Sequence, residues 1–115
     1  MNRQDQKAFY KASFFTTIKL TDGGQPVLLS SGDKLIFGVR AACADFAPYL
    51  VKKVLTSDYE LNGGYPIEIT PEEMTMAPGR YYYDVSVQTA AGSLIRVVPA
   101  SLFDVKASYT IKEES

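Results

Sequence analysis

The sequence predicts an all-β domain built as an antiparallel sandwich or barrel, and three observations lead to this prediction. The 115 residues are 46% hydrophobic and 22% charged, the balance of a soluble globular domain. Eight tyrosines and six phenylalanines supply the aromatic side chains that favour strands. Short runs of alternating apolar and polar residues are separated by turn signals at 22–24, 31–33, 62–64, 78–79 and 91–92.

The first half of the chain contains four predicted strands, at residues 14–20, 34–40, 50–56 and 66–70. In the second of these, Leu35, Phe37 and Val39 share the face that we expect to lie in the core. In the fourth, Ile67 and Ile69 are expected to point inward. The third run leaves its buried face undecided, because two lysines stand at its centre.

Residues 80–89 form the clearest strand. The face assigned to the core carries Tyr81, Tyr83, Val85 and Val87, and the outward face carries Tyr82, Asp84, Ser86 and Gln88. The turn that follows and the apolar run 94–98 predict a hairpin. Pro99 cannot donate a ladder hydrogen bond, so it marks an edge or a bulge. Pairing should resume at 102–105, and residues 109–111 are expected to add a short terminal strand.

One short helical turn is predicted in the crossover after the fourth strand. Thr70 is a favourable N-cap, Pro71 occupies the first helical position, and Glu73 completes a capping box. Pro78 and Gly79 then stop the helix early. This segment is therefore expected to be a crossover rather than a structural layer.

The length of the chain is that of one ordinary domain. We expect a single unit over residues 1–115, with flexible ends at 1–12 and 112–115. The polar start is not followed by the apolar run of a signal peptide, and no run approaches the roughly 18 residues of a membrane helix. The single cysteine, Cys43, cannot form an internal disulfide, which fits folding in a reducing cytoplasm.

The charge balance and composition exclude several function classes. Twelve Lys and Arg residues against 13 Asp and Glu residues give a formal net charge of −1, so neither nucleic acid nor an anionic membrane is expected as a partner. Because histidine is absent, a His-based metal site, a Ser-His-Asp triad and a Cys-His pair are ruled out. The acidic residues lack calcium-loop spacing, and the paired glycines are typical of turns, so we expect no metal and no cofactor.

Two catalytic candidates have plainer interpretations. Cys43 could act as a nucleophile, but Arg40 is the nearest basic residue in the sequence, and we favour a small buried or half-buried thiol. Glu72 and Glu73 could act as acid and base, yet adjacent residues on a helical turn point about 100° apart, and capping already accounts for Glu73. We therefore predict no catalytic residues and no enzymatic activity, with a hydrolase of unknown type as a less favoured alternative.

Aromatic residues outside the predicted core are the candidates for binding. Tyr82 projects outward beside an acidic residue, where it could form a sugar platform, anchor an interface or simply cover a sheet face. Residues 41–49 are expected to form a loop that exposes Phe46 and Tyr49. Together with Pro99 at the interrupted edge, these residues make up the predicted interaction surface.

Residues 30–106 resemble small prophage-encoded proteins of tails and baseplates. The resemblance begins with a Gly-Asp pair followed by an alternating strand at 32–37. It continues with an I-E-I-T-P-E-E element at 67–73, a P-G-R-Y-Y-Y-D strand at 78–84 and a G-S-L-I-R-V-V-P hairpin arm at 92–99, in that order.

This resemblance implies an immunoglobulin-like antiparallel β-sandwich of about seven strands with one short helical turn. Such domains are structural parts without enzymatic activity or catalytic residues. They are similar to the N-terminal domains of baseplate upper proteins, which attach receptor-binding fibres to the tail. This sequence lacks the fibre-forming helix of those longer proteins, so fibre attachment stays an open alternative.

We therefore expect a virion component made in the bacterial cytoplasm. Its partners would be other tail or baseplate proteins, and a homo-oligomer is expected within a symmetric ring. The alternative is an immunoglobulin-like binding module, either an adhesin or a carbohydrate-binding domain of a bacterial surface protein. Fold class cannot separate these functions, because sandwiches carry many of them.

Overall fold

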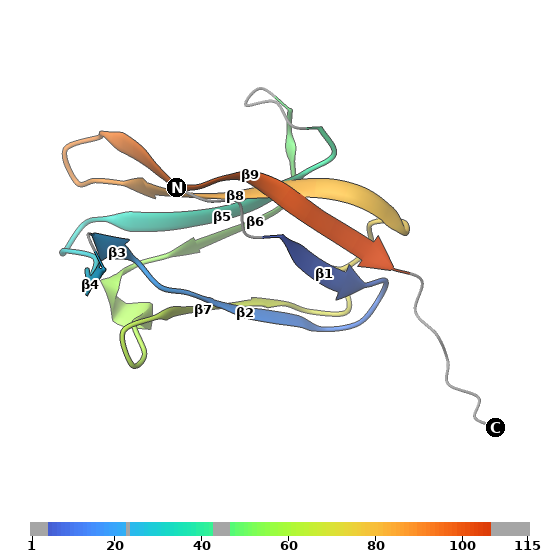
Figure 1. Ribbon diagram of the computed structural model, residues 1–115, viewed down its shortest axis with the longest axis horizontal. Helices are drawn as coiled ribbons and strands as arrows, with labels where there is room; N and C mark the ends of the chain where they lie inside the picture. The colour runs from blue at the N-terminus through green and yellow to red at the C-terminus, as the bar shows by residue number, and fades with distance from the viewer. Residues whose placement is uncertain (1–4, 23, 43–46, 107–115) are drawn as a thin grey trace.

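The computed structural model describes residues 5–22, 24–42 and 47–106, which form two layers of β-structure packed face to face (Figure 1). The larger layer is a five-stranded sheet in the order β1-β9-β8-β5-β6. In that order the strands span Gln6–Phe9, Leu94–Lys106, Gly79–Gln88, Lys34–Arg40 and Tyr49–Leu55. The facing layer pairs β2 (Phe14–Ile18) with β7 (Tyr65–Ile69), and a small hairpin of β3 (Thr21–Asp22) and β4 (Gln25–Pro26) lies at one end.

The strand order is that of an immunoglobulin-like sandwich. Along the chain, β1 belongs to the larger sheet, β2 to the smaller, β5 and β6 to the larger, β7 to the smaller, and the β8–β9 hairpin to the larger. The last hairpin therefore lies beside β5 and β6, as it does in immunoglobulin variable domains. The predicted all-β immunoglobulin-like fold is confirmed. One pairing is parallel, that of β1 with β9, so the sandwich is not antiparallel throughout.

The core lies between the two layers, where the alternation of residues predicts it. The predicted inward residues of β5 and β8 that are buried are Leu35, Phe37, Val39, Tyr83, Val85 and Val87. Neighbouring ring centres lie 5.4 Å apart for Phe37 and Tyr83, 6.2 Å for Tyr83 and Phe103, and 5.1 Å for Phe103 and Phe14. Because Phe14 belongs to β2, this chain of rings joins the two sheets. Burial raises the pKa of the Tyr83 hydroxyl.

The strand with the undecided face is β6, and its buried residues are Val51 and Leu55. Lys53 lies between them on the same face. Its Nζ donates to both carboxylate oxygens of Glu73 at 2.6 Å, and Glu73 belongs to the segment that follows β7. The lysine can therefore face inward at the sheet edge because its charge has a partner beside the other layer.

The capping box predicted at Thr70 is present. The Thr70 N–H donates to Glu73 Oε1 at 2.9 Å, and the Glu73 N–H donates to Thr70 Oγ1 at 3.3 Å. One bond from the Met74 N–H to the Thr70 carbonyl oxygen follows, and the chain then leaves the helical path. The hydrogen bonds from Lys53 and Thr70 lower the pKa of Glu73 from 4.5 to about 2. A further helical turn, the 3₁₀ helix η1 (Ser57–Tyr59), lies between β6 and β7, where the sequence pattern does not indicate it.

The start of the chain differs from the prediction of a flexible segment over residues 1–12. Gln6–Phe9 form β1, which pairs with the end of β9. The strand is held there because Ala8 is buried in the core and the Tyr10 N–H donates to the Lys106 carbonyl oxygen at 2.9 Å. At the other end, the strand expected at 109–111 and the end expected to be flexible at 112–115 lie outside the described residues.

The loop predicted at 41–49 is shorter than expected. Tyr49 is the first residue of β6, because its backbone pairs with that of Arg40 on β5. Cys43 and Phe46 lie outside the described residues. Of the two aromatic residues predicted in this loop, Tyr49 is therefore part of a strand of the five-stranded sheet.

β9 pairs irregularly with β8 at the predicted position. Between the pairs Tyr83–Ser101 and Val85–Val98, three residue steps on β9 correspond to two on β8. Pro99 lies within this stretch, so the predicted bulge is confirmed. Regular pairing resumes over residues 102–105, as expected.

Candidate interaction surface on the five-stranded sheet

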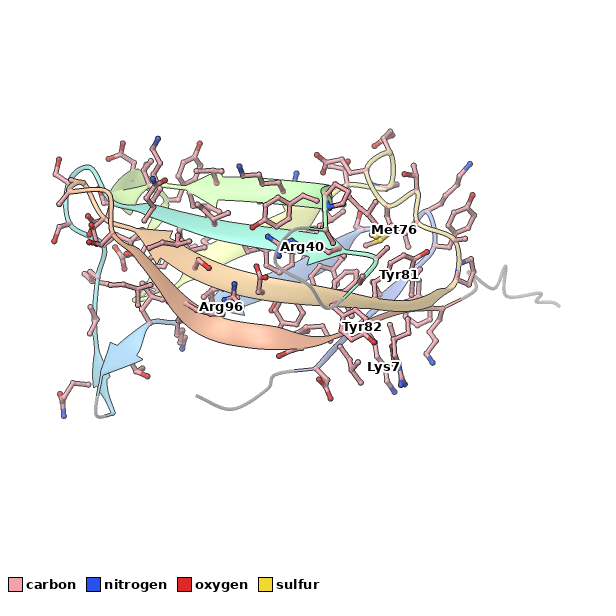
Figure 2. All side chains as sticks on the ribbon, turned by 90° about the horizontal axis from the view of Figure 1, so that it is seen from above. Lys7, Arg40, Met76, Tyr81, Tyr82 and Arg96 are labelled. Carbon is pink, nitrogen blue, oxygen red and sulfur yellow. The ribbon has the colours of Figure 1, made fainter. Side chains whose placement is uncertain are left out.

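Two of the predicted interaction residues, Tyr49 and Tyr82, come together on the outer face of the five-stranded sheet. The backbone of Arg40, at the end of β5, lies opposite Tyr49 of β6 on one side and opposite Tyr82 of β8 on the other. Residues directly opposite each other in a sheet project from the same face, so the three side chains form one row. Figure 2 is seen from the side of this face, with Arg40 and Tyr82 labelled. Asp84 projects from the same face, and we refer to Arg40, Tyr49, Tyr82 and Asp84 as the outer-face cluster.

The Tyr49 ring is held between a cation and the sheet backbone. The guanidinium carbon of Arg40 lies 4.2 Å from the ring centre, which is the geometry of a cation–π interaction. A second cation, the Nζ of Lys52, lies 5.6 Å from the same centre. Beneath the ring is Gly38, where a Cβ atom would overlap the ring carbons. Glycine at this position therefore lets the ring lie directly against β5.

Arg40 also pairs with a buried acid. Its Nη1 lies 3.6 Å from Oδ2 of Asp84, and the two side chains keep only 11% and 6% of their exposure. Ser86, the next outward residue of β8, is buried as well. A buried ion pair loses hydration on both partners, so it adds little net stability, but breaking it leaves an uncompensated charge. The centre of this sheet face is thus a buried polar site with an aromatic ring packed against the arginine.

The four predicted interaction residues do not form one surface. Tyr49 and Tyr82 belong to the outer-face cluster, and both are half-buried rather than fully exposed. Pro99 lies at the bulge in β9, and Phe46 lies outside the described residues.

Sequence reasoning missed the ion pair of Arg40 and Asp84 at the centre of the cluster. A signal for it was present, because both residues stand at outward positions of the predicted strands 34–40 and 80–89 and carry opposite charges. Antiparallel pairing of these two strands brings them close. The pairing itself, however, cannot be read from either strand alone.

The described parts of the chain bear on other kinds of functional site as well. They contain no group of three or more Cys, Asp or Glu side chains that could hold a metal ion. The carboxylate of Glu73, one of the two acid–base candidates, is engaged with Thr70 and Lys53. Within the same described ranges, no helix has the length and apolar character needed to cross a bilayer.

No protein-family model and no curated protein sequence matches the chain. Solved structures that resemble it include the following two. One is a Bacteroides vulgatus protein proposed to be a glycoside hydrolase, with 19% identity and a TM-score of 0.46; the match covers 93% of this chain and 17% of that protein. The other is murine CRIg, with 10% identity and a TM-score of 0.41, covering 91% of this chain and 92% of that protein. Similarity at this level has no bearing on function.

Proposed function

We propose that the protein is a non-catalytic structural domain of a bacteriophage or prophage tail or baseplate, which binds neighbouring proteins through the outer-face cluster. The observation that carries this proposal is the row of Tyr49, Arg40 and Tyr82 beside the buried carboxylate of Asp84. These side chains lie on the face of the sheet opposite the core. Tyrosine and arginine are the residue types that most often dominate the binding energy of protein interfaces.

The cluster is suited to binding because its central side chain is already ordered. Arg40 is held by the Tyr49 ring on one side and by Asp84 on the other. A partner that docks here would immobilise few further side chains, and the entropy cost of association would be correspondingly small. Tyr82, at the end of the row, offers a half-buried ring as an anchor.

The assembly context rests on the resemblance of residues 30–106 to prophage tail and baseplate proteins. The P-G-x-Y-x-Y-D pattern at 78–84 includes Asp84, so one residue of the cluster belongs to the pattern that carries the resemblance, while Tyr82 stands at a position that the pattern leaves open. On this proposal, the protein is made in the bacterial cytoplasm and becomes part of the virion. Its partners are other tail or baseplate proteins, and it needs no cofactor.

Co-expression with the products of the genes that flank its own tests the proposal. We expect the protein to co-purify with at least one flanking tail or baseplate protein, and Tyr82→Ala to reduce the recovered complex at least tenfold. Tyr59→Ala is the matched control, because Tyr59 is more than half exposed and belongs to η1, far from the cluster in sequence. Failure to co-purify with any of the flanking proteins would contradict the proposal. An equal reduction of the recovered complex in Tyr82→Ala and Tyr59→Ala would contradict it as well.

The alternative is a carbohydrate-binding module, and one observation favours it. Tyr82 is a half-buried ring at the end of the row on the outer face of the sheet, an arrangement that can stack on the face of a sugar. Screening against a glycan array decides between the two functions. Micromolar binding that is lost in Tyr82→Ala and kept in Tyr59→Ala would favour the binding module over the assembly domain.

A further inference from the structure

Positive charge is concentrated in the five-stranded sheet. As the structure describes them, the five strands of this sheet contain eight of the 12 Lys and Arg residues of the chain. The same strands contain only two of its 13 Asp and Glu residues. The sheet is therefore positively charged, although the formal net charge of the whole chain is −1.

Strand pairing places six of these cations on the outer face of the sheet, which also carries the outer-face cluster. Each of them lies opposite an outward residue of a neighbouring strand, or two residues from one on its own strand. All six are exposed, and we refer to them as the cationic rim: Lys7, Lys34, Lys52, Arg80, Arg96 and Lys106. Figure 2 shows Arg96 toward one end of this face and Lys7 toward the other, with Arg40 between them.

The two acids of the sheet lie on the same face, but both are shielded from solvent. Asp84 is 4% exposed and pairs with Arg40. Asp104 keeps 19% of its side-chain exposure, and its Oδ1 accepts a hydrogen bond from Arg80 Nε at 3.1 Å. The Arg80 side chain itself remains 61% exposed. The charge that these five strands present to solvent on the outer face is therefore positive.

The cationic rim borders an aromatic and apolar centre. Leu102 lies opposite Tyr82, so it extends the row of Tyr82, Arg40 and Tyr49 onto β9. Rim cations lie on both sides of this row: three toward the C-terminal end of β9, and three toward the opposite end of the sheet. An apolar centre within a charged border is the usual anatomy of a protein–protein interface.

The acids in the rest of the chain do not cancel this charge for a partner at the outer face. Packed sheets lie about 10 Å apart, and interactions between exposed charges are largely screened beyond about 8 Å at physiological salt. A partner that approaches the five-stranded sheet therefore meets mainly the cationic rim. Charge of one sign attracts a surface of the opposite sign and disfavours a surface of the same sign.

We propose that the partner docks on this face with an acidic protein surface, whose carboxylates pair with the cationic rim while apolar side chains cover the row of Tyr82 and Leu102. An acidic partner rests on the proposed function, because it specifies the chemistry of the protein that binds the outer-face cluster. A nucleic acid suits the face less well. Its backbone carries a phosphate at every nucleotide, and some of these charges would lie over the apolar centre and the Asp84 carboxylate.

Charge reversal in the complex with a flanking tail or baseplate protein tests this partner chemistry. Lys34→Glu combined with Lys106→Glu reverses the rim at both ends and should reduce the recovered complex at least tenfold. Lys11→Glu combined with Lys19→Glu is the matched control, because both lysines are exposed, lie outside the five-stranded sheet and give the same change of net charge. The complex should survive the control substitutions and should dissociate as the salt concentration is raised.

A second probe makes the test independent of the tail partner. A poly-glutamate peptide at low salt should bind the wild-type protein and the control variant equally. It should bind the variant with Lys34→Glu and Lys106→Glu at least tenfold more weakly. Single-stranded DNA of the same total charge is the competing anion, and tighter binding of DNA than of poly-glutamate would overturn the proposal.

The outcomes separate an acidic partner from the proposed function itself. Loss of the complex in Tyr82→Ala, but not in the variant with Lys34→Glu and Lys106→Glu, would keep the proposed function and overturn the acidic partner. If no flanking protein co-purifies, the proposed function fails and the poly-glutamate measurement decides. Binding that is lost on reversal of the rim would then support an acidic partner outside the tail, and absence of binding to the wild-type protein would overturn it.

Discussion

The guanidinium of Arg40 lies between an aromatic ring and a carboxylate, 4.2 Å from the centre of the Tyr49 ring and 3.6 Å from Asp84 Oδ2. The interactions couple three strands, because Arg40 belongs to β5, Tyr49 to β6 and Asp84 to β8. The outer face of the sheet therefore has an ordered centre of its own, separate from the core beneath it. The first two predictions concern this centre.

Removing one member of the ion pair should be worse than removing both. Arg40→Met removes the arginine that pairs with the buried Asp84 carboxylate, and we expect a loss of about 3 kcal/mol in the free energy of unfolding. Adding Asp84→Leu to this variant should restore a large part of the loss, since the carboxylate that lost its arginine is removed as well. Urea denaturation of the two single variants and the double variant measures the coupling. Simple additivity would show that the two side chains do not act as a pair.

Gly38→Ala should displace the Tyr49 ring. The added Cβ would overlap the ring carbons, so the ring has to move off β5, and we expect a loss of about 1–3 kcal/mol in stability. In a Tyr49→Ala background the same substitution should cost far less. Thermal unfolding of the four proteins of this cycle tests the prediction. An equal cost in both backgrounds would mean that the ring does not occupy that position.

Truncation of the two neighbouring tyrosines of β8 should have unequal effects. Tyr83 is fully buried within the aromatic chain of the core, so Tyr83→Ala should cost roughly 3–5 kcal/mol. Tyr82 is half-buried on the opposite face, and its replacement by alanine should cost clearly less. Chemical denaturation of both variants provides the comparison. The reverse order would mean that the strand register is shifted by one residue.

The capped turn should make stability depend on pH in the acid range. The pKa of Glu73 is lowered from 4.5 to about 2 by its hydrogen bonds to Lys53 and Thr70. A carboxylate with a lowered folded-state pKa contributes fully above its unfolded value, and the contribution is lost as pH falls from about 4.5 toward 2. Both partners are partly exposed, so the effect should stay below about 1 kcal/mol.

Glu73→Gln should remove this part of the pH dependence while the rest of the acid unfolding curve is kept. Thr70→Ala removes the other half of the capping box and should cost about 1 kcal/mol at neutral pH. Unfolding curves recorded between pH 2 and 7 cover both variants. If Glu73→Gln follows the wild-type curve throughout, the Lys53–Glu73 contact contributes nothing in solution.

Local patterns predicted the parts of the fold that depend on neighbouring residues in the chain. β8 has one face on the core, so its period-two alternation identifies Tyr83 and Val85 as buried. The capping box at Thr70 needs only four consecutive residues and forms as expected. The bulge at Pro99 follows from a missing N–H group, which is a property of the residue itself.

Local sequence patterns did not predict the contacts between segments that are distant in the sequence. β1 is only four residues long, and it is held by a parallel pairing with the far end of the chain. Lys53 faces inward because Glu73 comes from beside the other sheet. Asp84 is buried on an outward face because Arg40 pairs with it from a neighbouring strand. In each case the residue or strand that makes the contact is distant in the sequence, so the local pattern does not predict the contact.

The most direct test of the proposed function is whether the outer-face cluster is needed for incorporation of the protein into assembled tails. Particles would be purified from bacteria in which the wild-type gene has been replaced by Tyr82→Ala or by the control Tyr59→Ala, and the protein would be quantified in them by mass spectrometry. We expect wild type and Tyr59→Ala to be incorporated equally and Tyr82→Ala to be depleted at least tenfold, although the variant is folded and present in the cell. Absence of the wild-type protein from the particles, or full incorporation of Tyr82→Ala, would contradict it.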